Sequence, residues 1–212
     1  MIVVIRAISF AILGTALAAE SAPAQLKASG AFLAGYSRIS EDGAPGGSLA
    51  ATVNAFYHLH PAIGFGMEAG YLGFGSHPAS IDDTEVASGV MLSFAGKTEL
   101  SATQVTAQAL VRGIQGNTRP FVTAGAGVYV LKASAKGSIR IEDQMTQRTY
   151  HQWLEESESD KKFGFNFGGG LQFFPEPGRA GYIVDARLHV VPGAWLNGAS
   201  MNSFCLMAGL VF

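Results

Sequence analysis

Hydrophobic and polar residues alternate with a period of two along much of this chain, most clearly in its last ten residues. One face of segment 203–212 carries Phe204, Leu206, Ala208, Leu210 and Phe212. Successive side chains of a strand point to opposite sides of a sheet, so the residues between these form a second face. That second face carries smaller side chains of mixed polarity. This pattern predicts either a lipid-exposed barrel strand or a buried edge strand of a soluble sandwich.

The same alternation recurs in seven earlier segments. In chain order the segments are 26–37, 48–60, 63–75, about 100–113, 119–130, 163–174 and 182–191, followed by 203–212. We therefore predict an all-β fold, an eight-stranded antiparallel up-and-down transmembrane β-barrel. An even strand number would return both ends of the chain to the same side of the membrane.

Prolines and connection lengths agree with these boundaries. We expect every one of the 8 prolines to lie outside a strand interior, because proline cannot donate to a β-ladder. The connections after the second, fourth and sixth segments are short, whereas the others are long. Outer-membrane barrels have short periplasmic turns and long extracellular loops, so this alternation favours the barrel over a soluble sandwich.

Two long connections are harder to interpret. Residues 76–99 contain an apolar run, Val90 to Ala95, which could extend the fourth strand, form a hairpin or add a strand; we favour the extension. Residues 133–162 form the most charged stretch of the chain, and we expect a solvated mobile loop there. Its functional interpretation is a surface-exposed binding loop.

The amino-terminal residues are typical of an export signal. Arg6 precedes an apolar run, and small residues follow, so residues 1–24 are predicted to be a cleavable signal peptide with cleavage after Ala18 or Ala24. An uncleaved anchor is the alternative, although the run is shorter than the roughly 20 residues of a spanning helix. Residues 25–212 would form the barrel domain. The lone cysteine, Cys205, lies far from the signal and cannot form an intramolecular disulfide, so we expect no lipoprotein.

Composition narrows the class further. Hydrophobic residues make up 48% of the chain and charged residues 14%, and 27 of its 212 residues are glycine. A chain this apolar either packs one soluble core or spans a membrane as a barrel. The formal net charge of −2 argues against a nucleic-acid partner.

Four motifs carry a family resemblance over essentially the whole mature chain. They are the runs 119–127 (RPFVTAGAG) and 163–171 (FGFNFGGGL), the alternation 185–189 (DARLH) and the closing 208–212 (AGLVF). The chain resembles the OmpA/OmpX-like eight-stranded outer-membrane β-barrel family. The resemblance implies the bacterial outer membrane, a lipid environment and a monomer. It also implies that Gly209, Leu210 and Phe212 belong to a signal read by the barrel-assembly machinery.

Polar residues on the inward faces form the main candidate site. We predict a lumen polar network of Lys27, Asn54, His58, Glu68, Gln108, Arg112, Asp185, Arg187 and His189. An eight-stranded barrel is just wide enough for side chains to fill, so these groups are expected to pair into a plug. The alternative is a narrow gated conduit built from the same pairs.

The sequence offers little support for enzyme activity or metal binding. No pattern of the kind seen in barrel-type lipid A deacylases is present, and His77 to Ser80 has the wrong spacing. His58 and His60 share a strand face but have no third metal ligand placed by sequence. We expect no enzyme activity, no cofactor and no metal. Two functions remain: a structural or surface-interaction protein that displays its loops for adhesion or envelope integrity, and a narrow channel for ions or small solutes.

Overall fold

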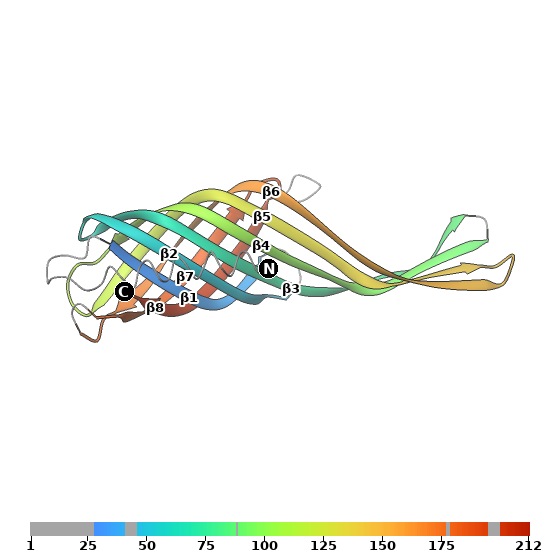
Figure 1. Ribbon diagram of the computed structural model, residues 1–212, viewed down its shortest axis with the longest axis horizontal. Coiled ribbons are helices and arrows are strands. Elements are labelled where there is room, and N and C mark those ends of the chain that lie inside the picture. The colour runs from blue at the N-terminus through green and yellow to red at the C-terminus, as the bar shows by residue number, and fades with distance from the viewer. Residues whose placement is uncertain (1–27, 41–45, 88, 177–178, 195–199) are drawn as a thin grey trace.

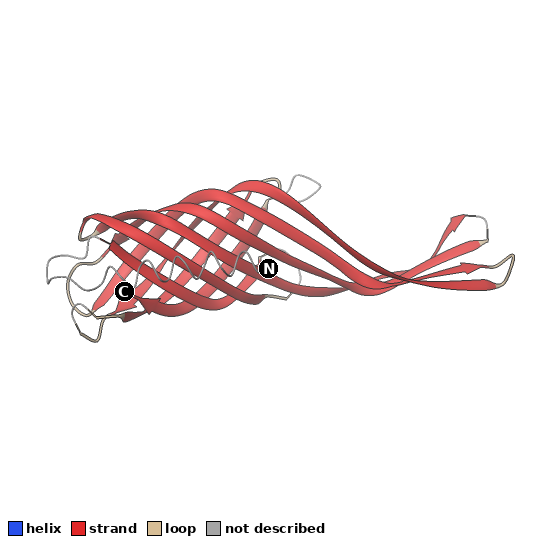
Figure 2. Ribbon diagram, in the orientation of Figure 1, coloured by secondary structure: helices blue, strands red, loops and turns tan. Residues whose placement is uncertain are grey.

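Eight antiparallel strands close into a barrel in which each strand pairs with the next one along the chain (Figures 1 and 2). The computed structural model describes residues 28–40, 46–87, 89–176, 179–194 and 200–212. The predicted signal segment 1–24 lies outside these residues. Among the described residues, no helix is long and apolar enough to cross a membrane. The predicted fold class is confirmed.

The strands are of two lengths. They are β1 (Ala28–Ile39), β2 (Ser48–His60), β3 (Ile63–Ala87), β4 (Val90–Arg112), β5 (Thr118–Asp143), β6 (Arg148–Phe173), β7 (Gly181–Val191) and β8 (Met201–Val211). Strands β1, β2, β7 and β8 contain 11 to 13 residues, whereas β3 to β6 contain 23 to 26. The closing contact runs from Ala31↔Val211 to Ile39↔Ser203 between β1 and β8.

In the barrel part of the strands, the alternation of side chains produces an apolar outer surface. Phe32, Val105, Phe165 and Leu206 each expose between 42% and 52% of their surface on this outer side. Their strand neighbours point inward and are buried, and many of those neighbours are polar. Polar residues inside and apolar residues outside are the arrangement that a hydrocarbon solvent requires.

The predicted loops 76–99 and 133–162 are strands, so the expectation of a mobile loop in the second was wrong. Strand β3 continues to Ala87 and β4 begins at Val90, which leaves a two-residue connection between them. In the same way β5 reaches Asp143 and β6 begins at Arg148. The favoured extension of the fourth strand is present, but β3 extends with it as a long hairpin.

Together these four strands form a sheet that rises beyond one end of the barrel (Figure 1). We call this part, residues 74–99 and 131–162, the extension. Its strands stay paired to the tip, as the register from Ser101↔Lys132 to Val90↔Asp143 shows for β4 and β5. A bulge between Gly73 and Ser76 marks its start on β3, where Gly75 adopts a φ of 85° that favours glycine.

The extension has two free edges. Strand β7 pairs with β6 only from Phe165↔Val190, so the upper part of β6 has no partner on that side. Likewise β2 pairs with β3 no further than Ala50↔Leu72. Pro78 lies inside β3 along this second edge, contrary to the prediction that all prolines lie outside strands. An edge tolerates proline because its N–H would point to solvent.

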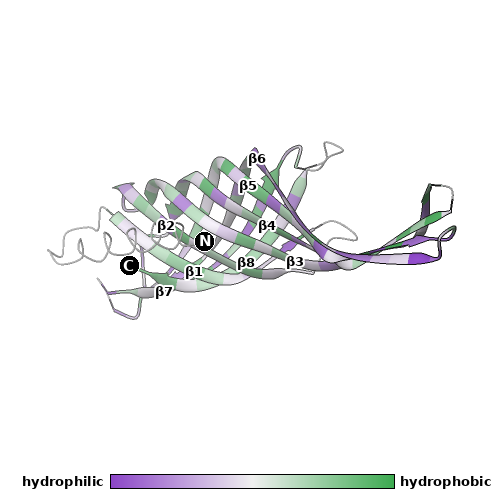
Figure 3. Ribbon diagram, turned by 45° about the vertical axis from the view of Figure 1, so that its right-hand side comes forward, coloured by the Kyte–Doolittle hydropathy of each residue, from purple (hydrophilic) through white to green (hydrophobic). Residues whose placement is uncertain are grey.

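The two faces exchange character along β4 and β5. The face that continues the lumen side carries Leu92, Phe94, Ile139 and Ile141, all half-buried and paired across the two strands. The face that continues the lipid side carries Lys97, Lys132, Lys136 and Arg140. Figure 3 shows hydrophobic and hydrophilic residues alternating along the barrel strands, and both kinds again in the extension.

Candidate functional site

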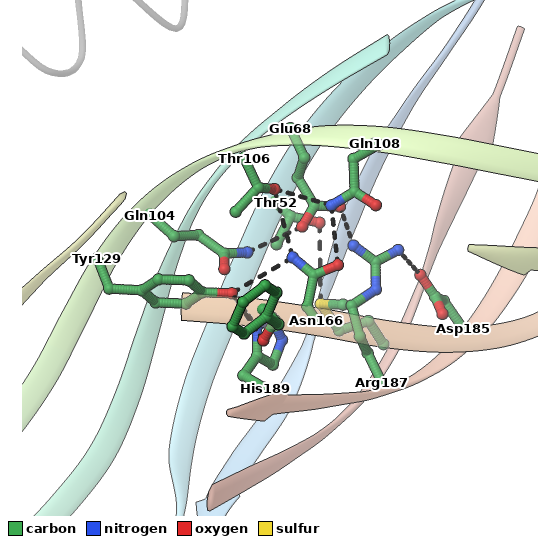
Figure 4. A network of polar contacts seen from close by, with 12 residues as sticks. Thr52, Glu68, Gln104, Thr106, Gln108, Tyr129, Asn166, Asp185, Arg187 and His189 are labelled. Atoms are coloured by element: carbon green, nitrogen blue, oxygen red, sulfur yellow. Dashed lines mark hydrogen bonds and ion pairs between the residues drawn. The ribbon is translucent and has the colours of Figure 1, made fainter. Parts of the chain in front are cut away.

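An ion-pair cluster occupies the middle of the lumen (Figure 4). The Arg187 guanidinium donates to Glu68 Oε2 through Nη1 and to Asp185 Oδ2 through Nη2, and all three side chains are buried. Gln104 Nε2 donates to the other Glu68 oxygen at 2.8 Å, and Asn54 lies opposite Glu68 across β2 and β3. Charges removed from water need such partners, because an unpaired buried charge is strongly destabilising.

A second set of hydrogen bonds lies beside this cluster and involves residues of β4, β5, β6 and β7. Gln108 Nε2 donates to Asn166 Oδ1 at 3.0 Å and to Thr106 Oγ1 at 2.8 Å. Asn166 Nδ2 lies 3.3 Å from the Tyr129 hydroxyl, which shares a 3.1 Å hydrogen bond with His189 Nδ1. The result is a belt of polar side chains that crosses the lumen (Figure 4). We call these two sets together the polar belt.

Beside the belt lies a small cavity of about 10 Å³. Its lining includes Thr123, Gln172, Asp185 and Arg187, each of which has one buried polar atom without a protein partner among the described residues. The four atoms are Thr123 Oγ1, Gln172 Oε1, Asp185 Oδ1 and Arg187 Nε. The volume and the mixture of donors and acceptors suit one bound water molecule.

Apolar side chains lie on both sides of the belt along the lumen. Toward the short turns they are Phe56, Leu110, Phe121 and Ile183, and toward the extension they are Ile39, Leu72, Phe74, Val191 and Met201, all at most 6% exposed. These residues belong to one cluster of buried hydrophobic side chains. The polar belt is therefore packed between two apolar layers.

The predicted network residues separate into two groups. Asn54, Glu68, Gln108, Asp185, Arg187 and His189 are buried in the belt or beside it. His58 lies nearer the short turns, where its Nε2 is 2.7 Å from Ser29 Oγ. Arg112 ends β4 and donates from Nε to the Pro61 carbonyl at 3.0 Å, in an exposed position. Thus the structure does not bring Arg112 or His58 to the ion pairs. Lys27 lies outside the described residues.

Several belt members were not predicted. Alternation predicts that Asn166, Gln104 and Thr106 point inward, as they do, but the predicted network did not include them. Tyr129 was harder to find, because a long aromatic residue in an apolar run is typical of a lipid-facing position. Its inward parity with Phe121 and Thr123 on β5 is the available signal.

The carboxy-terminal strand is firmly seated in the barrel. Phe212 N donates to the Gly30 carbonyl at 2.9 Å, and Gly30 N donates to the Phe212 carbonyl at 2.8 Å. Leu210 points outward with 48% of its surface exposed. Gly209 pairs with Leu33, and a Cβ at this position would collide with the Phe32 carbonyl oxygen. This close approach of β8 to β1 explains a glycine here.

The described residues hold no group of three or more His, Cys, Asp or Glu side chains arranged for a metal ion. Cys205 is a buried free thiol on β8.

The extension is the second candidate site. Ion pairs join exposed side chains on its outer face, including Lys136 with Glu155 at 2.7 Å and Arg140 with Glu142 at 2.7 Å. The hydrogen bond and charge of Glu155 raise the pKa of Lys136. Near the tip, Met145 is 80% exposed and Trp153 is 68% exposed. Such exposed large apolar side chains in a charged surface can serve as anchors for a partner.

Comparisons with known proteins agree with the barrel architecture. A family model described as "Outer membrane protein beta-barrel domain" matches residues 7–188. Neisserial surface protein A aligns with a TM-score of 0.55 at 12% identity, covering 88% of this chain and 96% of that one. No curated protein matches the sequence.

Two further solved structures are similar. Ail, the attachment invasion locus protein of Yersinia pestis, aligns at 20% identity and a TM-score of 0.40, covering 88% of this chain and 100% of its own. The N-terminal β-barrel domain of OprF from Pseudomonas aeruginosa aligns at 14% identity and a TM-score of 0.41, covering 87% and 97%.

Proposed function

The chain belongs to the outer membrane protein β-barrel domain family, and from this premise we propose that it is a surface-interaction protein whose extension binds a partner outside the cell. As a member it resides in the bacterial outer membrane. The observation that carries the proposal is the extension itself: a paired four-stranded sheet that holds more than half of the chain's charged side chains. A paired sheet displays side chains at less entropic cost than a mobile loop.

Trp153 is the first residue to test on this surface. It lies on β6 opposite Ser138, on the outer face, and its large exposed ring resembles the anchors that dominate many protein interfaces. Gln152 is its neighbour on the opposite face and provides a matched control. The proposal covers adhesion and envelope contacts alike, since both need a rigid surface presented to the outside.

The experiment compares bacterial cells that display different forms of the protein. One form lacks residues 80–95 and 138–153, which end on the register pairs Ser80↔Ala95 and Ser138↔Trp153, with each gap closed by Asn-Gly. We expect cell adhesion to host-cell or matrix-coated surfaces to fall to the level of cells without the protein. Trp153→Ala should reduce it partly and Gln152→Ala should not. Adhesion that survives the double deletion would refute the proposal, provided the barrel still migrates as a folded, heat-modifiable band.

We further propose that the lumen is a plug and that the channel alternative is the weaker one. The belt and its two apolar layers support this, because side chains fill the cross-section and apolar constrictions oppose the passage of ions. Planar bilayers containing the purified protein should show no steady single-channel conductance. Conductance that changes in Glu68→Gln would favour the channel instead.

For assembly, we propose that Phe212, Leu210 and Gly209 are read by the barrel-assembly machinery. The support is their place at the end of the strand that closes the barrel against β1. Phe212→Ser should lower the amount of folded protein in outer membranes more than it lowers refolding of the purified chain in detergent. Equal losses in both measurements would indicate a purely structural role.

A further inference from the structure

Lysines mark the upper limit of the lipid-facing band on β5 and β6. Along the outer face of β5, Val128 and Val130 are followed by Lys132. Along the same face of β6, Phe163, which is 58% exposed, is adjacent to Lys161. Both lysines are exposed. This is the level at which hydrocarbon must give way to lipid headgroups, because the next outward residues are polar.

The two lysines are neighbours across the strands. Lys132 pairs with Ser159 and Lys161 pairs with Val130, so they are diagonal neighbours on one face. Diagonal neighbours have Cβ atoms roughly 7 to 8 Å apart or somewhat less, and the flexible lysine stems let both ammonium groups approach one phosphate.

No acid on the same face of the described strands forms an ion pair with them. Glu99 of β4 is the diagonal neighbour of Lys132 across the β4–β5 ladder, but it pairs with Lys97. No ion pair joins Lys132 or Lys161 to an acid within the described residues, whereas Lys97 and Lys136, higher on the extension, pair with Glu99 and Glu155. The carboxylate nearest in sequence, Asp160, points to the opposite face and pairs with Lys162. Lys132 and Lys161 therefore bring positive charge without an ion-pair partner, among the described residues, to the boundary level.

A third cation ends the apolar outer face on the other side of the barrel. Arg38 follows Tyr36 on the outer face of β1 and pairs with Phe204 of β8. It is exposed and has no acid partner among the described residues. Two separate parts of the circumference therefore end their apolar outer face in a cation.

We propose that Lys132 and Lys161 form a binding site for the phosphate of an outer-leaflet lipid headgroup. The acyl chains of that lipid would lie along Val128, Val130 and Phe163, and its phosphate would lie between the two ammonium groups. Along the outer face toward the extension, the apolar surface comes first and the unpaired positive charge follows. A lipid presents its acyl chains and then its phosphate in the same order. It is independent of the partner proposed for the extension.

The test uses full-length protein in phosphatidylcholine nanodiscs that contain a small fraction of bis-phosphorylated lipid A. Native mass spectrometry then measures how much lipid A stays bound to the protein. A lysine near an anionic surface contributes about 1 kcal/mol, or roughly fivefold in affinity. Lys132→Gln with Lys161→Gln should therefore weaken retention by roughly 30-fold. Lys136→Gln, which removes a lysine already paired with Glu155, should leave it unchanged.

Two further arms identify the group that is bound. Dephosphorylated lipid A should be retained weakly by the wild type, and free inorganic phosphate should not displace intact lipid A. Lys132→Arg with Lys161→Arg should keep retention, which separates charge from a folding defect. Equal retention by the wild type and the glutamine double variant, or equal retention of both lipid forms, would overturn the proposal.

Discussion

The barrel and the extension use the same strands in opposite ways. Within the barrel, β5 turns Val122 and Val128 outward and keeps Thr123 inside. In the extension the same strand turns Lys136 outward and Ile139 toward the lumen side. The alternation with a period of two continues unbroken. The outer face, however, changes from contact with lipid to contact with water. The lumen-side face changes from a packed interior to a half-buried apolar surface.

This exchange locates the membrane along the chain. Strand pairing alone cannot do so, because the ladder between β4 and β5 runs without a register shift from the short turns to the tip. The polarity of the outer face supplies the missing information, since charged side chains are costly on a lipid-facing surface and harmless above it. Equivalent changes made in the two regions should therefore have very different effects.

The largest difference is expected between buried and exposed ion pairs. Arg187→Met leaves Glu68 and Asp185 as buried carboxylates without a cation, at a cost of about 3–5 kcal/mol. Urea unfolding in lipid vesicles, followed by the heat-modifiable gel shift, measures this loss. The triple variant Glu68→Gln, Asp185→Asn, Arg187→Met should recover most of the stability, because it removes the uncompensated charges.

The matched change in the extension is Arg140→Met. Arg140 and Glu142 also form a pair at 2.7 Å, but their side chains are 50% and 43% exposed. Water and salt screen such pairs, so we expect no shift of the unfolding midpoint. A loss comparable to that of Arg187→Met would show that the extension and the barrel unfold as one unit held by these charges.

The next difference concerns a new charge on the outer face of β6. Phe165→Arg places a cation among lipid chains and should cost about 2–4 kcal/mol if the site is near the bilayer midplane. Ser157→Arg alters the same face of the same strand in the extension and should leave stability unchanged. Unfolding in vesicles compares the two. A cost at Ser157 equal to that at Phe165 would place the membrane boundary above the lysine pair.

Sequence alternation was sufficient for the barrel because hydrocarbon imposes a strict rule on each strand. It predicted eight strands in an up-and-down barrel and the inward direction of Glu68 and Arg187. In the extension most apolar residues of β4 and β5 lie on the opposite face, and charges are frequent. Segment 133–162 therefore has the composition of a solvated loop, although β5 and β6 pair throughout it.

Alternation also gave the face of a residue but not its height in the lumen. Arg112 and Arg187 both have inward parity. Arg112 ends its strand and bonds the Pro61 carbonyl, whereas Arg187 lies in mid-strand beside Glu68. The stagger of the strands decides which polar residues lie at the same height in the lumen. This stagger is set by the pairing register of the strands, which the sequence pattern does not reveal.

The free edge of β6 differs from the closed barrel, which has none. Glu156 and Glu158 are exposed on this edge strand, and charge on an edge discourages pairing with another chain. We expect Glu156→Thr with Glu158→Thr to cause self-association in detergent, measured by analytical ultracentrifugation. Glu142→Thr changes an interior strand of the same sheet and should stay monomeric. A monomeric edge variant would mean that the acids do not protect the edge.

The smallest effect on stability is expected from a fall in pH. Acid should destabilise the tip of the extension at a higher pH than it destabilises the barrel. At the β5–β6 turn, Asp143 accepts hydrogen bonds from Thr146 Oγ1 at 2.7 Å and from the backbone N–H groups of Thr146 and Met145. These bonds to Thr146 lower the pKa of Asp143 below its ordinary value of 3.8. A lowered pKa in the folded state contributes stability that is complete above the ordinary value and is lost as pH falls through the lowered one. The protection factors of the turn amides, which compare their hydrogen exchange with the intrinsic rate at each pH, should therefore fall only below about pH 4, and Asp143→Asn should remove that dependence. The amides of the barrel strands should stay protected over the same range, because their hydrogen bonds lie within lipid and do not depend on this carboxylate.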